Sequence, residues 1–152
     1  MASASPDGAP YLVPLSFDWD GEALLVATPT DSPTGRNLAA TRAVRLGLGH
    51  TRDVSMIEGD VEALEIDALP QKRGDRFAAR TGFDPRTLST PYRWFRISPR
   101  RIQAWREAAF TSLARSFIAA RSSAVNPSDV SSLAVVRLAD FCAIPCSLLC
   151  ES

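Results

Sequence analysis

Apolar and polar residues alternate with a period of two in several short segments of the chain, the pattern of half-buried β-strands. The first such segment is Tyr11–Phe17, in which every second residue is apolar or aromatic. Pro14 lies inside it and lacks the N–H that a strand ladder requires. Asp20-Gly21 then predicts a tight hairpin turn, so we expect Glu22–Thr28 to be the return strand.

A short helix is predicted over residues 33–41, where the alternation stops. Asp31 or Ser32 supplies an N-cap, and proline follows in the first turn. Backbone N–H groups at a helix start can hold a phosphate, and three polar side chains lie there: Thr34, Arg36 and Asn37. An ordinary capped helix with a solvated arginine explains the same residues, and the local sequence by itself favours that simpler interpretation.

Two more strands are predicted after this helix. Ala43–Gly49 alternates cleanly and places Gly47 and Gly49 on one face, which leaves room for another backbone or for a ligand ring. Val54–Ile66 is a longer strand in which Gly59 predicts a bulge. Together with the earlier strands, this is a meander typical of a small antiparallel barrel.

The next segment, Ala68–Thr81, has helical periodicity, with Leu69, Phe77 and Ala78 on its buried side and a glycine at its end. A strand is then predicted over Tyr92–Ser98; a kink at residues 99–101 interrupts it, and Ile102–Arg106 continues it. This strand carries Trp94, Gln103 and Trp105. Core packing explains the large aromatic residues, and so does a stacking surface for a planar ligand.

Composition narrows the functional classes. The chain has 152 residues, of which 45% are hydrophobic and 22% charged, as expected of about one globular domain. The 17 basic residues balance the 17 acidic ones, which argues against nucleic acid or an anionic membrane as the main partner. Sixteen of the basic residues are arginine, the side chain that best matches the geometry of carboxylates and phosphates.

The three cysteines, Cys142, Cys146 and Cys150, are spaced four residues apart and would share one helix face. The single histidine, His50, is distant in sequence, so we interpret these thiols as structural or incidental and predict no metal site. No signal peptide is visible, and charged residues and a proline interrupt the apolar segment 133–150, which argues against a membrane span. We therefore expect a cytoplasmic protein.

Several motifs, in this order and spacing, resemble the pyridoxamine 5'-phosphate oxidase-like family, the flavin-binding split barrels of the flavin/deazaflavin oxidoreductase superfamily. The resemblance covers residues 1 to about 107. It is carried by Pro-Asp-Gly-Ala-Pro at 6–10, Leu-Val-Pro-Leu at 12–15, Trp-Asp-Gly at 19–21, Arg-Asn-Leu at 36–38, Val-Arg-Leu at 44–46, Gly-His-Thr-Arg-Asp at 49–53 and Pro-Arg-Arg-Ile-Gln-Ala-Trp-Arg at 99–106.

The resemblance implies a mainly β (α+β) fold, an antiparallel split barrel with short helices, which works as a homodimer with two flavin sites at the interface. The flavin ring would lie along Val13, Pro14, Leu15 and Ser16. The FMN phosphate would be held by Thr28, Ser32, Thr34, Arg36 and Asn37. The other subunit would contribute Gln103 and Trp105. The protein needs no catalytic acid or base, because the cofactor transfers the hydride.

The chain also departs from the family in two places. Family members usually begin further upstream, so the strand before the turn at residues 6–9 is expected to be incomplete. Residues 108–152 do not resemble the usual family ending, and we expect them to form a C-terminal helical tail, with Phe110, Leu113, Phe117 and Ile118 at helical spacing. The expected organisation is therefore a split-barrel domain over residues 1–107 followed by this tail.

Three hypotheses for function follow from the resemblance. The first is an FMN-dependent oxidoreductase acting on a small organic substrate, with a deazaflavin coenzyme as the alternative cofactor. The deazaflavin has a longer acidic tail, which Arg36, Arg42 and Arg45 would favour. The second hypothesis is a non-catalytic cofactor-binding protein, and the third is a cofactor-free remnant that serves only for association.

Overall fold

The computed structural model describes residues 1–50, 52–106 and 123–125. Its helices are α1 (Pro33–Thr41) and α2 (Gln71–Thr81), and its short 3-10 turns are η1 (Ile66–Ala68) and η2 (Pro85–Thr87). Its strands are β1 (Ala2–Ala4), β2 (Pro10–Leu12), β3 (Asp18–Trp19), β4 (Leu24–Pro29), β5 (Ala43–His50), β6 (Asp53–Leu64), β7 (Tyr92–Arg106) and β8 (Ser123–Val125).

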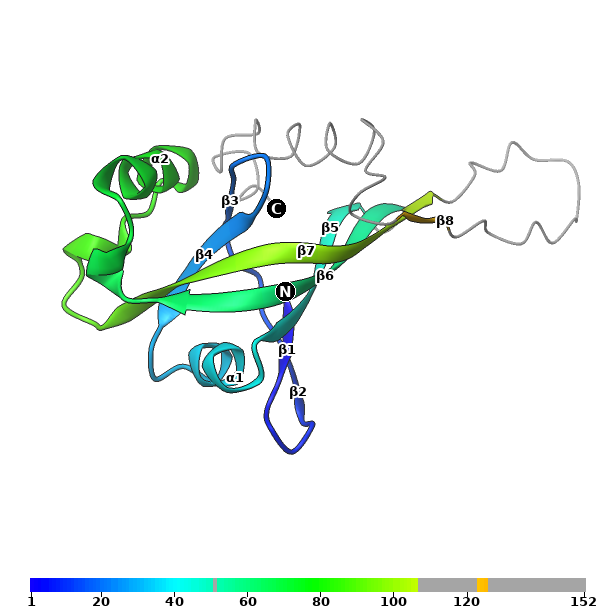
Figure 1. The fold of residues 1–152 in the computed structure, drawn as a ribbon, viewed down its shortest axis with the longest axis horizontal. Helices are drawn as coiled ribbons and strands as arrows, with labels where there is room; N and C mark the ends of the chain where they lie inside the picture. Colours follow the sequence, from blue (N-terminus) through cyan, green and yellow to red (C-terminus); the bar gives the residue numbers. More distant parts are fainter. Residues whose placement is uncertain (51, 107–122, 126–152) are drawn as a thin grey trace, which may run out of the picture.

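All strand pairings in the described residues are antiparallel and form one open sheet in the order β2-β1-β5-β6-β7-β4-β3. The long strand β7 organises this sheet (Figure 1). One of its edges pairs with β6 along its length, and the other pairs with β4 near its start and with β8 near its end. The result is the β-rich, split-barrel type of fold that the resemblance predicted.

Strand β4 is a continuous apolar run because both faces of the sheet are covered where it pairs with β7. On one face, Leu24 and Val26 join Phe95, Ile97 and other apolar side chains in a large core that includes Leu38 of α1. On the other face, a second core sits beneath α2 and contains Leu25, Ala27, Phe77 and Trp94. The two helices accordingly lie on opposite sides of this part of the sheet (Figure 1).

Helix α1 has the bounds that its sequence predicted, because its stop and start signals are local. Ser32 is its N-cap and accepts a hydrogen bond from the N–H of Gly35 (3.0 Å), while Pro33 occupies the first helical turn. At the other end Arg42 adopts a left-handed conformation (φ 52°) and its N–H donates to the carbonyl of Leu38.

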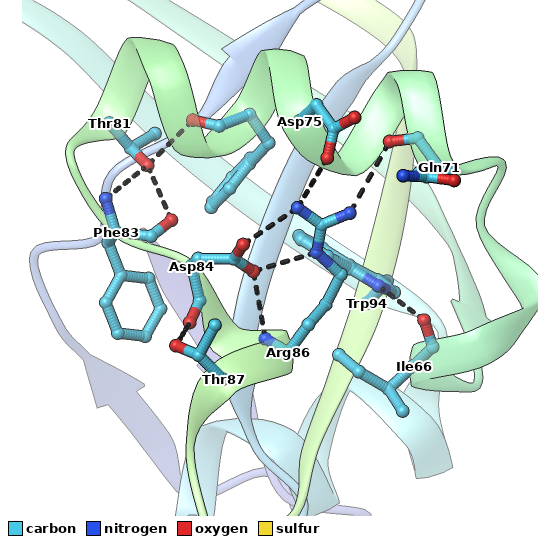
Figure 2. Close-up of polar contacts among 10 residues, drawn as sticks. Ile66, Gln71, Asp75, Thr81, Phe83, Asp84, Arg86, Thr87 and Trp94 are labelled. Atoms are coloured by element: carbon cyan, nitrogen blue, oxygen red, sulfur yellow. Dashed lines mark hydrogen bonds and ion pairs between the residues drawn. The ribbon is translucent and has the colours of Figure 1, made fainter.

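Helix α2 begins three residues later than the predicted start at Ala68 and ends as predicted, with Gly82 (φ 68°) as its C-cap. Pro70 explains the late start, because a proline disfavours helical backbone in the residue before it, Leu69. Phe77 is buried, as predicted, and meets the ring of Trp94 edge-on at a centroid distance of 5.0 Å. The indole N–H of Trp94 donates to the carbonyl of Ile66 (3.1 Å; Figure 2). Core packing is therefore the role of this tryptophan.

The loop after α2 is held by Arg86, whose guanidinium donates to Asp84 (2.8 Å) and to Asp75 (2.7 Å; Figure 2). Hydrogen bonds from Arg86 lower the pKa of Asp84, and the two carboxylates raise the pKa of Arg86. The same guanidinium lies against Gly74, where an added Cβ would come within 2.6 Å of Nη1. This cluster fixes α2 to the segment that leads into β7.

The predicted strand Tyr11–Phe17 is wrong in its extent. Strand β2 ends at Leu12, β3 contains only two residues, and the residues between them are not in a strand. Pro14 contributes to this break because it cannot donate to a ladder. The Asp20-Gly21 turn is confirmed, with Gly21 at φ 105° and the Asp20 carboxylate accepting from the N–H groups of Glu22 and Ala23.

The remaining strands follow the prediction with small changes. Strand β6 ends two residues before the predicted Ile66, and the bulge at Gly59 is confirmed as a register shift between Glu58 and Gly59. The predicted kinked strand over residues 92–106 is confirmed as β7, and Pro99 lies opposite the bulge, so the pairing continues through the kink. The turn at residues 6–9 joins β1 to β2, with Gly8 at φ 90°.

Most of the predicted C-terminal tail, including the helical positions from Phe110 to Ile118 and all three cysteines, lies outside the described residues. Within that tail, β8 is a strand rather than a helix and pairs with residues 102–104 of β7. None of the described helices has the length and apolar character required to cross a membrane.

Candidate functional site

The candidate site is built on the turn that leads from β4 into α1. The hydroxyl of Ser32 donates to the carbonyl of Pro29 (2.7 Å) and accepts from the N–H of Gly35 (3.0 Å). The hydroxyl of Thr28 lies 3.0 Å from the same oxygen. Since the single O–H of Ser32 is already donated, Thr28 must be the donor in this pair. Two of the three hydroxyls predicted for the phosphate site, those of Thr28 and Ser32, are thus brought together and hold the turn in place.

Gly35 allows α1 to start this close to the end of β4. A Cβ at this position would lie 2.4 Å from the carbonyl oxygen of Pro29 and 2.9 Å from that of Thr30, both far inside contact distance. The N–H of Arg36 also donates to the carbonyl of Ser32 (3.0 Å). Two first-turn N–H groups therefore already have acceptors within the protein, so an anion here would depend on side chains.

Arg36 is exposed on this turn, where its guanidinium donates to the carbonyl of Asp31. The other predicted residues of the helix lie deeper: Thr34 is 3% exposed and Asn37 is 8% exposed. The amide of Asn37 donates to the hydroxyl of Ser3 in β1 (3.3 Å). Arg36 is accordingly the cation that presents its charge to solvent beside the helix start, and Asn37 ties the helix to β1.

The segment predicted to lie along a ring, Val13–Ser16, follows β2 and leads to β3. Val13 is bonded through its backbone to the first residue: its N–H donates to the carbonyl of Met1 (3.0 Å), and the terminal ammonium donates to the carbonyl of Val13 (2.8 Å). Pro14 and Ser16 are exposed, while Val13 and Leu15 are half-buried. Within the described part of the chain, no hydrogen bond joins this segment to the turn at Ser32.

Gln103 and Trp105 lie elsewhere, on the outer face of the sheet. Across the three strands β5, β6 and β7, one row of paired residues is Gly47, Met56 and Gln103. Another row is Gly49, Val54 and Trp105. Directly opposed residues project to the same face of a sheet, and this face is opposite the core that contains Leu46 and Ile102. The two glycines and the two predicted partner-facing residues therefore share one surface.

The sequence interpretation missed a row of arginines that fastens α2 to the hairpin of β3 and β4. Arg73, Arg76 and Arg80 recur at helical spacing, and they pair with Asp20 (Arg73) and Asp18 (Arg76 and Arg80). Although burial opposes it, hydrogen bonds from Ala23 and Glu22 and the charge of Arg73 lower the pKa of Asp20. The arginine spacing was the signal that could have revealed this contact.

Together, the open antiparallel sheet and the capped turn define a split-barrel protein. The model of the family described as Pyridoxamine 5'-phosphate oxidase matches residues 1–106, and the chain belongs to this family. No curated protein matches the chain at a significant level.

Solved structures agree with this assignment. A protein described as an F420 reductase is 25% identical, with a TM-score of 0.50, over 64% of this chain and 82% of its own. A pyridoxamine 5'-phosphate oxidase-related, FMN-binding protein from Nostoc punctiforme is 16% identical, with a TM-score of 0.51, over 83% of this chain and 85% of its own. A protein from Listeria innocua described as a putative pyridoxamine 5'-phosphate oxidase is 16% identical, with a TM-score of 0.54, over 68% of this chain and 83% of its own. At 16% identity, the proteins from Nostoc punctiforme and Listeria innocua show only that this chain has the same fold.

Proposed function

We propose that this protein is a flavin-dependent oxidoreductase that binds FMN as a homodimer and acts on a small organic molecule. The observation that carries the proposal is the exposed guanidinium of Arg36 at the start of α1, above a turn that Ser32 and Thr28 hold in one shape. Membership of the pyridoxamine 5'-phosphate oxidase family supports it.

In this proposal Arg36 forms the fork that binds the cofactor phosphate, because guanidinium matches the geometry of phosphate oxygens. Thr28 and Ser32 position the turn through their own hydrogen bonds. Thr34 and Asn37 would contribute further polar groups from the buried side of α1, and Asn37 also holds α1 against Ser3. The residues of the turn thus fit a phosphate group that approaches from the solvent side.

The ring of the cofactor would lie along Val13, Pro14, Leu15 and Ser16, of which Pro14 and Ser16 are exposed. The second subunit would bring Gln103 and Trp105 over it from the outer face of its own sheet. Gly47 and Gly49 place no side chain on that face, which leaves room for a close approach of the second subunit. The bound flavin would supply the hydride chemistry, while these residues bind it, orient it and exclude water.

A deazaflavin coenzyme is the second candidate for the same site. The structural likeness at 25% identity to a protein described as an F420 reductase favours it. Arg42, exposed at the far end of α1, and Arg45, exposed on β5, would add positive charge for a longer acidic tail. The choice between the two cofactors is therefore a question of relative affinity.

Titration of the purified full-length chain with FMN and with F420 tests the proposal, with cofactor fluorescence and absorbance as readouts. We expect FMN to bind, with a stoichiometry of one cofactor per chain, and a bound flavin that is bleached by a reduced nicotinamide. Preference for F420 would transfer the assignment to a deazaflavin-dependent reductase.

Two other results would replace the proposal. Tight cofactor binding without reduction by any donor would support a non-catalytic cofactor-binding protein. Failure to bind either cofactor, with the fold intact by circular dichroism, would refute the oxidoreductase and leave a protein that serves only for association.

A further inference from the structure

A small pocket of about 240 Å³ opens on the outer face of the sheet and contains Gln103. Its floor is the backbone of β5 and β6 around Leu46 and Ile57, and its walls include Leu12 and Met56. Strands β1 and β2, which carry Ala2 and Leu12, lie on one side of β5. Strand β6, which carries Met56, lies on the other side. The pocket is thus a slot over β5 with apolar walls.

Gly47 creates this slot. It is directly opposite Met56 in the sheet, and a Cβ built on it would meet only Val54 Cγ2, at 4.0 Å. Gly49 differs, because it has φ 113° and a Cβ there would lie 2.2 Å from the carbonyl of Asp53. The turn after β5 explains Gly49, whereas no backbone requirement explains Gly47. What the glycine at position 47 provides is open space above a flat strand.

The rim of the slot is charged on one side. Glu58 lies 3.1 Å from Arg45, 3.7 Å from Arg100 and 3.9 Å from Arg101, and Arg100 also approaches Asp60 (3.7 Å). Of these charged residues, Arg45 and Glu58 line the slot itself, and the Glu58 side chain is the less exposed of the two (21%) and lies within 4 Å of three guanidinium groups. The side chain of Arg45 is 77% exposed and lines the slot, so it is the cation that a ligand in the slot can reach.

We propose that this slot binds the ring of a planar aromatic carboxylate, with the carboxylate paired to Arg45 and the ring resting on Gly47 between Leu12 and Met56. A flat ring matches a space that is bounded by apolar walls and a strand backbone, and an anion matches the exposed guanidinium of Arg45. This inference rests on the proposed function, in which Gln103 of the same pocket faces the cofactor of the other subunit. The aromatic acid would then be the substrate, held across the interface from the flavin ring.

Saturation-transfer NMR and calorimetry on the full chain without cofactor would test the site with benzoate and 2-naphthoate, each paired with its neutral amide. We expect the carboxylates to bind several-fold more tightly than the amides. Gly47→Leu should abolish binding by filling the slot, whereas Gly47→Ala, whose Cβ has room, should bind like the natural protein. Arg45→Gln should weaken binding of the carboxylates by roughly two- to fivefold, the range for an exposed charged pair, and leave binding of the amides unchanged.

The inference is overturned if neither carboxylate binds, if Gly47→Leu binds them normally, or if Arg45→Gln has no effect on them. It is also overturned if Gly47→Leu changes only the oligomeric state by light scattering, because the slot would then receive a second copy. The FMN and F420 titrations separate this site from the proposed function. Binding of cofactor without binding of a carboxylate would refute only the proposal for the slot. Binding of a carboxylate without binding of cofactor would support the slot and refute the oxidoreductase.

Discussion

The carboxylate of Asp18 in β3 is completely buried and lies 3.2 Å from the Nε of Arg76 in α2. Arg80 approaches the same carboxylate at 3.5 Å, and neither oxygen of Asp18 accepts a hydrogen bond from the described residues. The arginine side chains are about 40% exposed. The arginines are therefore partly hydrated in the folded protein, whereas the carboxylate of Asp18 is not.

This asymmetry predicts unequal costs for removing each partner. Arg76→Met combined with Arg80→Met should lower the free energy of unfolding by about 3 kcal/mol, because it leaves a buried carboxylate without its cations. Asp18→Asn should cost about 1 kcal/mol, since the exposed arginines regain water. Urea unfolding of both variants measures the difference, and a larger loss for Asp18→Asn would show that the arginines do not depend on burial in this way.

The contact also explains why β3, at Asp18–Trp19, could not be predicted from alternation. Strand β3 is placed by Asp18, which pairs with residues 58 and 62 positions further along the chain, and a local pattern carries no information on such a partner. Helix α1 was predicted to the residue because Ser32, Pro33 and Gly35 act within one turn. Local capping chemistry is visible in a sequence, whereas long-range ion pairs are visible only as spacing.

The same distinction applies to the candidate site. The hydroxyls of Thr28 and Ser32 are four residues apart and meet at 3.0 Å, as a local turn allows. Gln103 and Trp105 are a different case. They lie on another part of the sheet, and they would meet a cofactor together with Thr28 and Ser32 only in the proposed dimer. Motif resemblance supplied that expectation, and alternation by itself could not.

Gly74 and Arg86 form a second testable pair. Alanine normally stabilises a helix interior by about 0.5–1 kcal/mol relative to glycine, but a Cβ at Gly74 would lie 2.6 Å from Nη1 of Arg86 and 3.0 Å from Cζ. Gly74→Ala should therefore give no gain in the natural protein and the full gain in an Arg86→Ala background. Thermal or urea unfolding of the four proteins closes the cycle. Equal gains in both backgrounds would mean that the guanidinium moves aside without loss.

Asp84 should make stability depend on acid pH. Its pKa is held below the ordinary value of 3.8 by hydrogen bonds from Arg86. A lowered native pKa stabilises the fold fully above the unfolded-state pKa, and this contribution is lost as the pH falls through the native value. Asp84→Asn keeps the acceptor for the Arg86 N–H but removes the charge, so it should cost about 1 kcal/mol at pH 7.

The pH profile distinguishes charge from shape at this position. The natural protein and Asp84→Asn should converge in unfolding free energy below the native pKa, where both side chains are neutral. Urea unfolding between pH 2 and pH 7 records this convergence on a scale of about 1 kcal/mol. A constant difference over the whole range would assign the effect to packing instead of to the carboxylate charge.

Arg36 is the residue on which the proposed phosphate site depends. Arg36→Ala should weaken FMN binding by roughly 1.5–3 kcal/mol, the scale of a charged hydrogen bond, and Arg36→Lys should recover part of it because lysine keeps the charge without the fork. Fluorescence titration measures both. Lys72→Ala removes one exposed positive charge from α2 and serves as the matched control. If Arg36→Ala and Lys72→Ala titrate alike, the phosphate lies elsewhere.

Trp105 tests whether the second subunit reaches the cofactor. It lies opposite Val54 on the outer face of the sheet, and an indole close to a flavin alters the fluorescence of the flavin. Trp105→Ala should raise the fluorescence of bound FMN, whereas Trp105→Phe should retain part of the quenching because a ring remains. Light scattering on the same samples shows whether the dimer persists, which separates a lost ring contact from a lost interface. If the variant stays dimeric with an unaltered spectrum, Trp105 packs within its own subunit and the cofactor is enclosed by other residues.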